Sequence, residues 1–280
     1  MLGQRIVTAA VLLALLLPAL FASQPWAFAA LTLLLIAAAG WEWGRLNDAG
    51  GPGSLALGAC LAAACAVAWT FKWTAVASAA IWWFMAAVWI IGGALALRAG
   101  PALWQRVPQP QRWIFGLVAL WAAWLAVVQA RAIGLNFILS VFCLVWVADI
   151  AAYAGGRAFG RHKLAPTISP GKSWEGAFSG LLGVWVLGLF WMLVIDQQLP
   201  IDADSVYSNL CSRFGWVGFF VLTAGLSAMS VVGDLMESLV KRAAGAKDSS
   251  GLLPGHGGVL DRLDALLPVF PIALALGSLS

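Results

Sequence analysis

Residues 133–152 read IGLNFILSVFCLVWVADIAA, an apolar stretch with a single carboxylate, Asp149, near its C-terminal end. A helix of roughly 20 such residues crosses the ~30 Å hydrocarbon core of a bilayer. The rest of the chain has the same character, because 62% of its 280 residues are hydrophobic and only 10% are charged. A water-soluble domain of this composition could not cover its surface with polar groups. We therefore expect an all-α, polytopic membrane protein.

The chain divides into about nine predicted transmembrane helices, and no composition shift separates domains. We expect one membrane domain over residues 1–280, with N-terminal spans in 1–130 and catalytic spans and cytoplasmic loops in 131–280. The predicted spans are 5–22, 25–41, 55–71, 74–97, 113–130, 133–152, 175–195, 214–236 and 264–280. The first could instead be a cleaved signal peptide, with Arg5 as its charged region and Ala22 near the cleavage site, but the second span that follows directly favours a retained helix.

Two connections on the side away from the N-terminus carry specific expectations. Spans five and six are separated by a turn that we expect to be as short as Arg131. The loop 196–213 contains Asp196, Asp202 and Asp204, which we expect to be solvated carboxylates without a functional role.

The distribution of basic residues predicts the orientation. When the connections alternate between two sides, thirteen of the 16 Lys and Arg fall on the N-terminal side, and only Lys72, Arg131 and Arg213 fall on the other. Cytoplasmic loops hold an excess of Lys and Arg. We therefore expect a multi-pass protein of the cell (inner) membrane with a cytoplasmic N-terminus. The net charge of +4 reflects this asymmetry, so we expect no nucleic-acid partner.

Carboxylates from three predicted spans reach the cytoplasmic side at one depth. They are Asp149, Asp234 and the pair Asp261 and Asp264, which are three residues apart and share a helix face. Carboxylates that border hydrocarbon are costly to ionise and usually meet a cation. Such a set suits Mg²⁺ and a polyphosphate, although each Asp could instead pair with a nearby Lys or Arg and close a helix end. Asp234 and Glu237 repeat the three-residue spacing, but Glu237 is the weaker candidate, because it lies nearer the aqueous loop and could be a solvated end charge.

The first long cytoplasmic loop, 154–175, is rich in Gly, Pro and Ser. This content argues against a continuing helix and provides a backbone able to wrap an anion. Ser173 is the predicted N-cap of the seventh span, which would place free backbone N–H groups beside Lys172. Arg157 could add a contact to phosphate, whereas we expect His162 to be exposed.

The second long loop, 238–264, alternates cations and carboxylates around the turn Pro254-Gly255-His256-Gly257-Gly258. Glycines in such a turn permit positive φ and close approach of the backbone to a ligand. These features favour a nucleotide-binding loop.

Two stretches resemble one known family. Segment 238–264 resembles the signature of the phosphatidate cytidylyltransferase (CDP-diacylglycerol synthase) family without a departure from its pattern. The run Asp149-x-x-Ala-Tyr153-x-x-Gly156-Arg157-x-Phe159-Gly160, followed by Ser169-Pro-x-Lys172-Ser173-x-Glu175-Gly176, is similar to that family's other cytoplasmic stretch. Together they cover less than half of the chain, and the remaining spans match only in hydrophobicity and approximate number.

The resemblance implies that a phosphatidate oxygen attacks the α-phosphorus of CTP and releases pyrophosphate. We assign Asp149, Asp234 and Asp261 as ligands of Mg²⁺, with room for a second cation, and Asp264 as a further ligand or as a residue that orients a basic neighbour. Lys172 completes the expected catalytic group.

The expected substrate-binding residues are the basic and hydroxyl side chains of the two loops. They are Arg157, Ser169, Ser173, Lys241, Arg242, Lys247, His256 and Arg262. The small-residue spacing of Gly176 and Gly180 suits helix packing, including contacts in a homodimer.

Two other functions are weighed. An alcohol phosphatidyltransferase is expected to carry a run of Asp-Gly, Ala-Arg, Gly and two further Asp, which this sequence does not contain. A cation-coupled transporter predicts ionisable groups near the bilayer midplane and paired broken helices, whereas here the carboxylates lie at one edge and no repeat is found.

Overall fold

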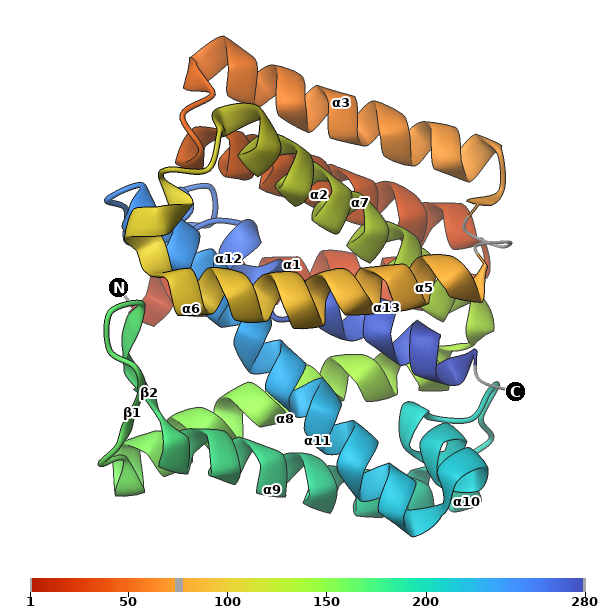
Figure 1. Cartoon of the computed structure of the whole chain (residues 1–280). Helices are drawn as coiled ribbons and strands as arrows, with labels where there is room; N and C mark the ends of the chain where they lie inside the picture. The colour runs from red at the N-terminus through yellow and green to blue at the C-terminus, as the bar shows by residue number, and fades with distance from the viewer. Residues whose placement is uncertain (1, 74–77, 279–280) are drawn as a thin grey trace.

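The computed structural model describes residues 2–73 and 78–278. It is a helical bundle with one small β-hairpin (Figure 1). The elements are α1 (Leu2–Phe21), α2 (Pro25–Leu46), α3 (Gly50–Thr70), α5 (Ala79–Ala87), the π-helical turn η1 (Val88–Gly92), α6 (Gly93–Trp104), α7 (Gln109–Ile133), α8 (Leu135–Phe159), β1 (Lys163–Ala165), β2 (Ser169–Ser173), α9 (Trp174–Phe190), the π-helical turn η2 (Trp191–Ile195), α10 (Asp196–Gln198), α11 (Val206–Ala243), α12 (Leu260–Leu263) and α13 (Leu266–Gly277).

The fold is all-α and polytopic, as the composition predicts. Among the described residues, 7 helices are long and apolar enough to cross a membrane. The predicted first span corresponds to α1, whose apolar part Val7–Phe21 is shorter. The predicted ninth span corresponds to α12 and the 12-residue α13. The total of nine crossings stays a prediction.

Helix α13 forms the centre of the bundle. All of its residues from Leu266 to Leu276 are buried, and it packs against α5, α7, α8 and α11. A helix that is apolar all round belongs in the interior. Because Asp264 lies only two residues before the start of this helix, the segment that carries Asp261 and Asp264 is fixed to the core.

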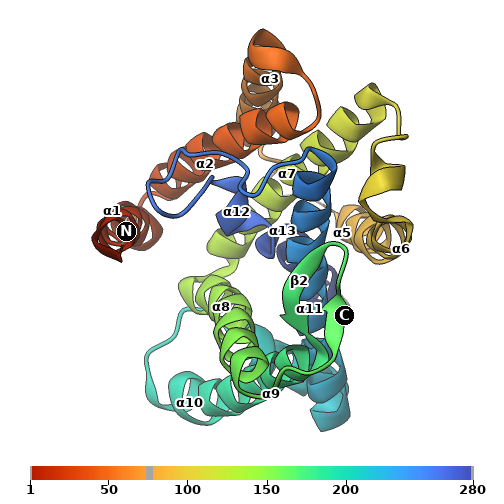
Figure 2. The same ribbon diagram turned by 90° about the vertical axis from the view of Figure 1, so that its left-hand side faces the viewer.

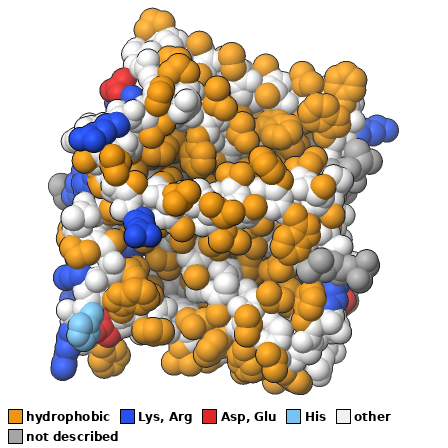
Figure 3. Space-filling view, viewed as in Figure 1, with side chains coloured by type: hydrophobic (Ala, Val, Ile, Leu, Met, Phe, Trp, Pro, Cys, Tyr) orange, Lys and Arg blue, Asp and Glu red, His pale blue; other side chains and the backbone are white. Residues whose placement is uncertain are grey.

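The connections that the sequence places on the N-terminal side all lie at one end of the bundle, at the left of Figure 1. They follow α2, α6, α8 and α11, while the other connections lie at the opposite end. In the space-filling view, most of the visible Lys and Arg line that same edge, and hydrophobic side chains cover the middle (Figure 3).

Several helix boundaries differ from the sequence prediction. Helix α8 does not stop before Ala154 but continues through Gly155 and Gly156 to Phe159. The end of α8 packs closely on α9, which supports the extra helical turn. At Gly176 of α9, an added Cβ would lie only 2.8 Å from the Ala152 carbonyl oxygen of α8. Small residues therefore bring α8 and α9 together within one chain, and the homodimer stays a prediction.

Helix α11 also extends beyond its predicted range of 214–236 at both ends. Gly215 has φ +66 and breaks the helix, so the predicted start lies at this break. At the other end, the helix includes Ser238, Lys241 and Arg242, which the sequence analysis assigned to a loop.

The turn between α7 and α8 lies at Gly134 and not at Arg131. A Cβ at Gly134 would lie 2.5 Å from the Cβ of Ala203, in the loop between α10 and α11. Only glycine therefore fits at this position. Arg131 remains helical, and its guanidinium donates to the carbonyl oxygens of Leu20 (2.7 Å) and Ala22 (3.0 Å). It therefore fastens the C-terminal end of α1.

The carboxylates of the loop before α11 are more than solvated charges. Asp202 accepts hydrogen bonds from the backbone N–H groups of Leu135 (2.6 Å) and Asn136 (3.0 Å), at the start of α8. Asp196 accepts from the hydroxyls of Ser205 (2.6 Å) and Ser208 (2.5 Å). Both side chains therefore have a structural role that the sequence did not predict: Asp202 caps the start of α8, and Asp196 holds two serines at the start of α11.

We expect Asp202→Ala to lower the free energy of unfolding by about 1 kcal/mol, the usual cost of losing a helix N-cap. Burial would raise the pKa of Asp202, but the N–H groups of Asn136 and Leu135 outweigh it and hold the pKa below its usual value. The stabilisation is therefore present at neutral pH and is lost as the pH falls through that lowered pKa. Thermal unfolding in detergent at several pH values measures it. Asp204→Ala, which removes an exposed carboxylate of the same loop, is the control, and equal melting of the two variants at neutral pH would contradict the assignment.

Candidate active site

Two polar stretches that are distant in sequence meet at the end of the bundle that faces the viewer in Figure 2. One consists of the C-terminal part of α8 and the β1–β2 hairpin. The other is residues 238–264, here called the signature segment, which comprises the end of α11, the following loop and α12. The strands of the hairpin are antiparallel, with Lys163 opposite Ser173, and Arg242 donates to the Ile168 carbonyl oxygen (3.3 Å). The hairpin is thus attached to the signature segment.

The first charged group centres on Lys172. Its ammonium lies 2.7 Å from Asp234 Oδ2, and the Ser238 hydroxyl donates to Asp234 Oδ1 at 3.2 Å. Asp149 interacts electrostatically with both Lys172 and Asp234. Three elements, α8, β2 and α11, therefore bring together the residues that the sequence analysis selected.

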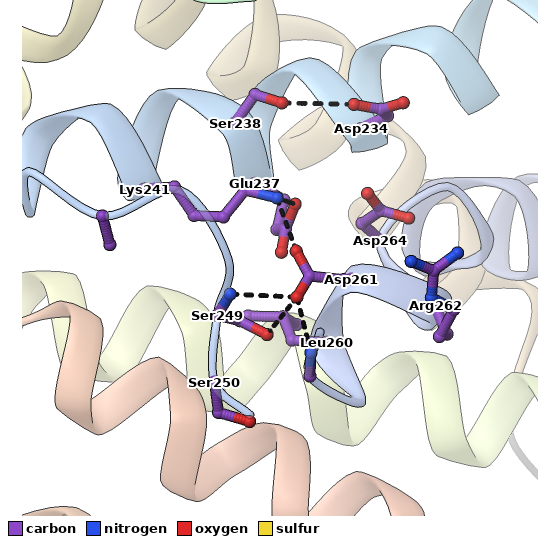
Figure 4. Close-up of polar contacts among 12 residues, drawn as sticks. Asp234, Glu237, Ser238, Lys241, Ser249, Ser250, Leu260, Asp261, Arg262 and Asp264 are labelled. Atoms are coloured by element: carbon purple, nitrogen blue, oxygen red, sulfur yellow. Dashed lines mark hydrogen bonds and ion pairs between the residues drawn. The ribbon is translucent and has the colours of Figure 1, made fainter. Parts of the chain in front are cut away.

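The second charged group centres on Lys241, which lies between two carboxylates (Figure 4). Its Nζ is 2.5 Å from Glu237 Oε2 and 2.5 Å from Asp261 Oδ1. Glu237 is only 3% exposed, so it is not a solvated end charge. The helix continues past Glu237 and carries it into the bundle, where it needs a cation.

Asp261 organises the signature segment around itself. Its Oδ2 accepts from the Ser249 backbone N–H (2.9 Å), the Ser249 hydroxyl (2.8 Å) and the Gly258 backbone N–H (2.7 Å). Burial would raise the pKa of Asp261, but the hydrogen bonds from Glu237, Lys241, Gly258 and Ser249 together hold it well below its usual value. Asp261 is therefore an ionised anchor for the loop that precedes α12.

Asp264 lies between the two charged groups. It interacts electrostatically with Asp234, Lys172 and Lys241, and its Oδ1 accepts from the Ala265 backbone N–H at 2.7 Å. The combined cluster holds more carboxyl groups than ammonium groups. Its members are Asp149, Asp234, Glu237, Asp261 and Asp264 against Lys172 and Lys241.

This excess of carboxyl groups suits a bound cation. Within the described residues, no three metal-binding side chains are already grouped closely enough to hold an ion. Instead, the ammonium groups of Lys172 and Lys241 lie against the carboxylates of Asp234 and Asp261. Carboxylate oxygens are the ligands that Mg²⁺ prefers, so these side chains are chemically suited to bind it. In this structure, two ammonium groups contact the same oxygens.

Glu42, on α2, is a site residue that the sequence analysis missed. It is fully buried and accepts hydrogen bonds from the backbone N–H groups of Val259 (2.9 Å) and Leu260 (2.6 Å). It also accepts from the hydroxyls of Ser249 (3.1 Å) and Ser250. The signal that could have found it was a carboxylate directly at the end of the predicted second span, 25–41, since charged groups that border hydrocarbon need a partner.

The glycines of the turn behave as expected. Gly255 and Gly257 have φ of +77 and +83, which L-residues rarely adopt. A Cβ at Gly258 would overlap Glu42 Oε1 and Ser249 Oγ. Gly258 therefore allows the backbone to close over the Glu42 carboxylate and the Ser249 hydroxyl, in addition to any approach to a ligand.

The predicted phosphate-binding residues differ in their surroundings. Ser173 is the N-cap of α9, as predicted, and accepts from the Gly176 backbone N–H at 3.2 Å. Arg242 and Arg262 contact backbone carbonyls, with Arg262 Nη2 2.6 Å from the His256 oxygen. The others lie at the same end of the bundle: Arg157 and Lys247 are exposed, and Ser169 and His256 are half-buried. His162 is also exposed, as expected, and pairs with Glu175 at 2.6 Å.

Comparison with known proteins gives a consistent result over the whole chain. Residues 3–280 match the sequence model of the cytidylyltransferase family. The chain is 37% identical to a phosphatidate cytidylyltransferase of Pseudomonas aeruginosa over 99% of its own length and 97% of that protein. It is 48% identical to a phosphatidate cytidylyltransferase of Haemophilus influenzae over 49% of its length and 44% of that protein. It is also 44% identical to one from Brucella suis over 52% of its length and 48% of that protein.

We expect Glu42→Ala to loosen the signature segment, because the buried N–H groups of Val259 and Leu260 lose their acceptor at a cost of about 1–3 kcal/mol each. Limited trypsin digestion at Lys247, which is exposed in the loop after α11, measures the effect, and cleavage should become faster. The control is Asp48→Ala, which removes a carboxylate that is 73% exposed and pairs with Arg112. Unchanged cleavage of the Glu42 variant would show that this carboxylate does not hold the segment.

Proposed function

The chain belongs to the cytidylyltransferase family, and we propose that it converts CTP and phosphatidate into CDP-diacylglycerol and pyrophosphate. The observation that carries this function is the ion pair of Lys172 with Asp234 at 2.7 Å. It ties the first of the two stretches that resemble the phosphatidate cytidylyltransferases to helix α11, whose C-terminal end belongs to the second stretch. As a CTP-dependent nucleotidyltransferase, the protein acts in phospholipid biosynthesis.

The reaction forms a bond between a phosphatidate oxygen and the α-phosphorus of CTP, and it breaks the bond from that phosphorus to the oxygen of the leaving pyrophosphate. The nucleophile is a phosphate monoester that is largely ionised near neutral pH, so no strong general base is needed. The task of the protein is to hold two polyanions in line and to stabilise the negative charge that spreads in the transition state.

We assign the cation site to Asp149, Asp234 and Asp261, with Asp264 beside them. These carboxylates would hold a divalent cation, proposed to be Mg²⁺, which would supply positive charge for the substrate phosphates. In this proposal, Lys172 and Lys241 turn from their carboxylate partners to the substrate phosphates. Asp234 and Asp261 then present free oxygens. The excess of carboxyl groups over ammonium groups leaves room for a second cation.

The remaining basic and hydroxyl groups are assigned to the substrates. Arg157 and Lys247 are exposed at the same end of the bundle and can meet an incoming nucleotide triphosphate. Arg242 and Arg262 shape the loops by holding backbone carbonyls and add positive charge. Ser169, Ser173 and His256 are assigned to lighter polar contacts.

The protein is a multi-pass membrane protein, and we propose that its active site faces the cytoplasm from the inner membrane. The connections rich in Lys and Arg gather at the end where the charged cluster lies, which follows the positive-inside rule. CTP reaches that face from water, while phosphatidate keeps its acyl chains in the leaflet. Nothing in the comparisons supports the alternative of a cation-coupled transporter.

The direct test is to incubate the purified protein with labelled CTP, phosphatidate and Mg²⁺. We expect CDP-diacylglycerol and pyrophosphate in equal amounts, and we expect removal of divalent cations by a chelator to abolish turnover. Replacing CTP by ATP is the control for nucleotide choice. Absence of both products across varied lipid and salt conditions would overturn the proposed function.

We expect Asp234→Asn to lower kcat by about 10²-fold or more, because the site loses one negative charge that prepares it for cations. The Mg²⁺ concentration needed for half-maximal rate should also rise, which distinguishes cation binding from a loss of folded protein. Asp204→Asn, in the exposed loop at the other end of the bundle, is the matched control and should retain full activity. Similar kinetics for the two variants would contradict the assigned site.

A further inference from the structure

A separate apolar cavity of about 390 Å³ lies beside the charged cluster. Its walls come from α1, α2, α7, α8 and the signature segment with the start of α13. In Figure 2 these helices surround the region between α1 and α12. The charged cluster described above uses none of the side chains of α1 and α2 that line this cavity.

One end of the cavity is polar. His256 and Arg262 of the signature segment line it, and Arg262 follows Asp261 directly. The Nδ1 atom of His256 is buried and has no hydrogen-bond partner within the described part of the chain. The Thr8 hydroxyl donates to the Pro254 carbonyl oxygen at 2.8 Å, which joins α1 to the turn beside His256. A cation and an unpartnered imidazole nitrogen at one end suit a phosphate group.

The rest of the cavity is lined almost entirely by hydrocarbon side chains. They extend along α1 from Ala9 to Leu16, about 10 Å at the rise of an α-helix. On the antiparallel α2 they run from Ile36, near the polar end, to Leu31, deeper in the bundle. Such walls exclude a nucleotide, which has no apolar part of this length, and suit a hydrocarbon chain.

The cavity also reaches the lipid-facing surface. Its lining residues Leu13, Leu15 and Trp146 are 45%, 54% and 42% exposed. Leu13 and Leu15 are on α1, which packs mainly against α2, and Trp146 is on α8. A lipid could therefore enter sideways between α1 and α8 with its head group at the level of the charged cluster.

We propose that this cavity holds one acyl chain of phosphatidate, with the lipid phosphate at the His256 and Arg262 end. The inference rests on the proposed function and adds where the lipid substrate binds. The polar end of the cavity and the charged cluster share the signature segment, so a phosphate held there lies next to the site of nucleotidyl transfer. The deep end runs into the bundle in the direction that a lipid tail takes from the membrane surface.

The test compares Leu31→Trp, which fills the deep end, with Leu34→Trp on the same helix. Leu34 is 67% exposed and does not line the cavity. For Leu31→Trp we expect kcat/KM for long-chain dioleoyl phosphatidate to fall by about tenfold through overpacking. The value for short-chain dioctanoyl phosphatidate and the KM for CTP should change less than twofold. Leu34→Trp should match the unmodified protein with both lipids. Equal losses for both lipids, or no loss for either, would overturn the proposal.

A second measurement uses the unmodified full chain and does not depend on turnover. Phosphatidate with a photoreactive diazirine on one acyl chain is cross-linked in detergent micelles, and the labelled peptides are identified. We expect labels within 9–16 or 31–36 that excess phosphatidate displaces and excess phosphatidylcholine does not. Labelling only at other helices, or equal displacement by both lipids, would refute the acyl-chain site. Because this readout is independent of product formation, it separates failure of the cavity from failure of the proposed reaction.

Discussion

Charged side chains at the edge of a hydrocarbon layer need partners of opposite sign, and in this chain that requirement determines where several helices end. Lys172 pairs with Asp234, and Lys241 pairs with both Glu237 and Asp261. These contacts join β2, α11 and α12, which are separated from one another in the sequence. The catalytic end of the molecule is therefore held together by the same groups that we assign to phosphate and cation binding.

This arrangement has a consequence for mechanism. A site that balances carboxylates with lysines before substrates arrive avoids leaving a buried charge unpaired, which would cost several kcal/mol. Substrate phosphates and a divalent cation can then exchange with these internal partners, so the number of buried unpaired charges stays small throughout the proposed reaction. Asp261 is the exception, because three donors besides Lys241 hold it in place. Its first role is to shape the loop.

The N-terminal helices are part of the site and not merely a membrane anchor. Glu42 on α2 fixes the backbone of the signature segment from behind, and Thr8 on α1 contacts the Pro254 carbonyl. Arg131 in turn holds the C-terminal end of α1. These contacts explain how a segment with several glycines keeps a defined shape. The same helices line the apolar cavity that we assign to the lipid, and this cavity lies beside the charged groups that we assign to the nucleotide. An enzyme that joins a membrane lipid to a water-soluble nucleotide requires both.

The sequence by itself determined the all-α membrane class, the gathering of basic connections at one end and the residues of the charged cluster other than Glu237, because hydropathy and charge are local properties of each segment. It also predicted the Ser173 N-cap and the positive φ of the turn glycines, which follow from local chemistry. Only the tertiary structure decided that α8 continues through its glycines, that the chain turns at Gly134, that Glu237 is buried and that Glu42 belongs to the site. Each of these four features depends on which residues pack against it from another helix or loop. Such contacts join residues that are distant in sequence, so they leave no periodic pattern in the sequence of one helix alone.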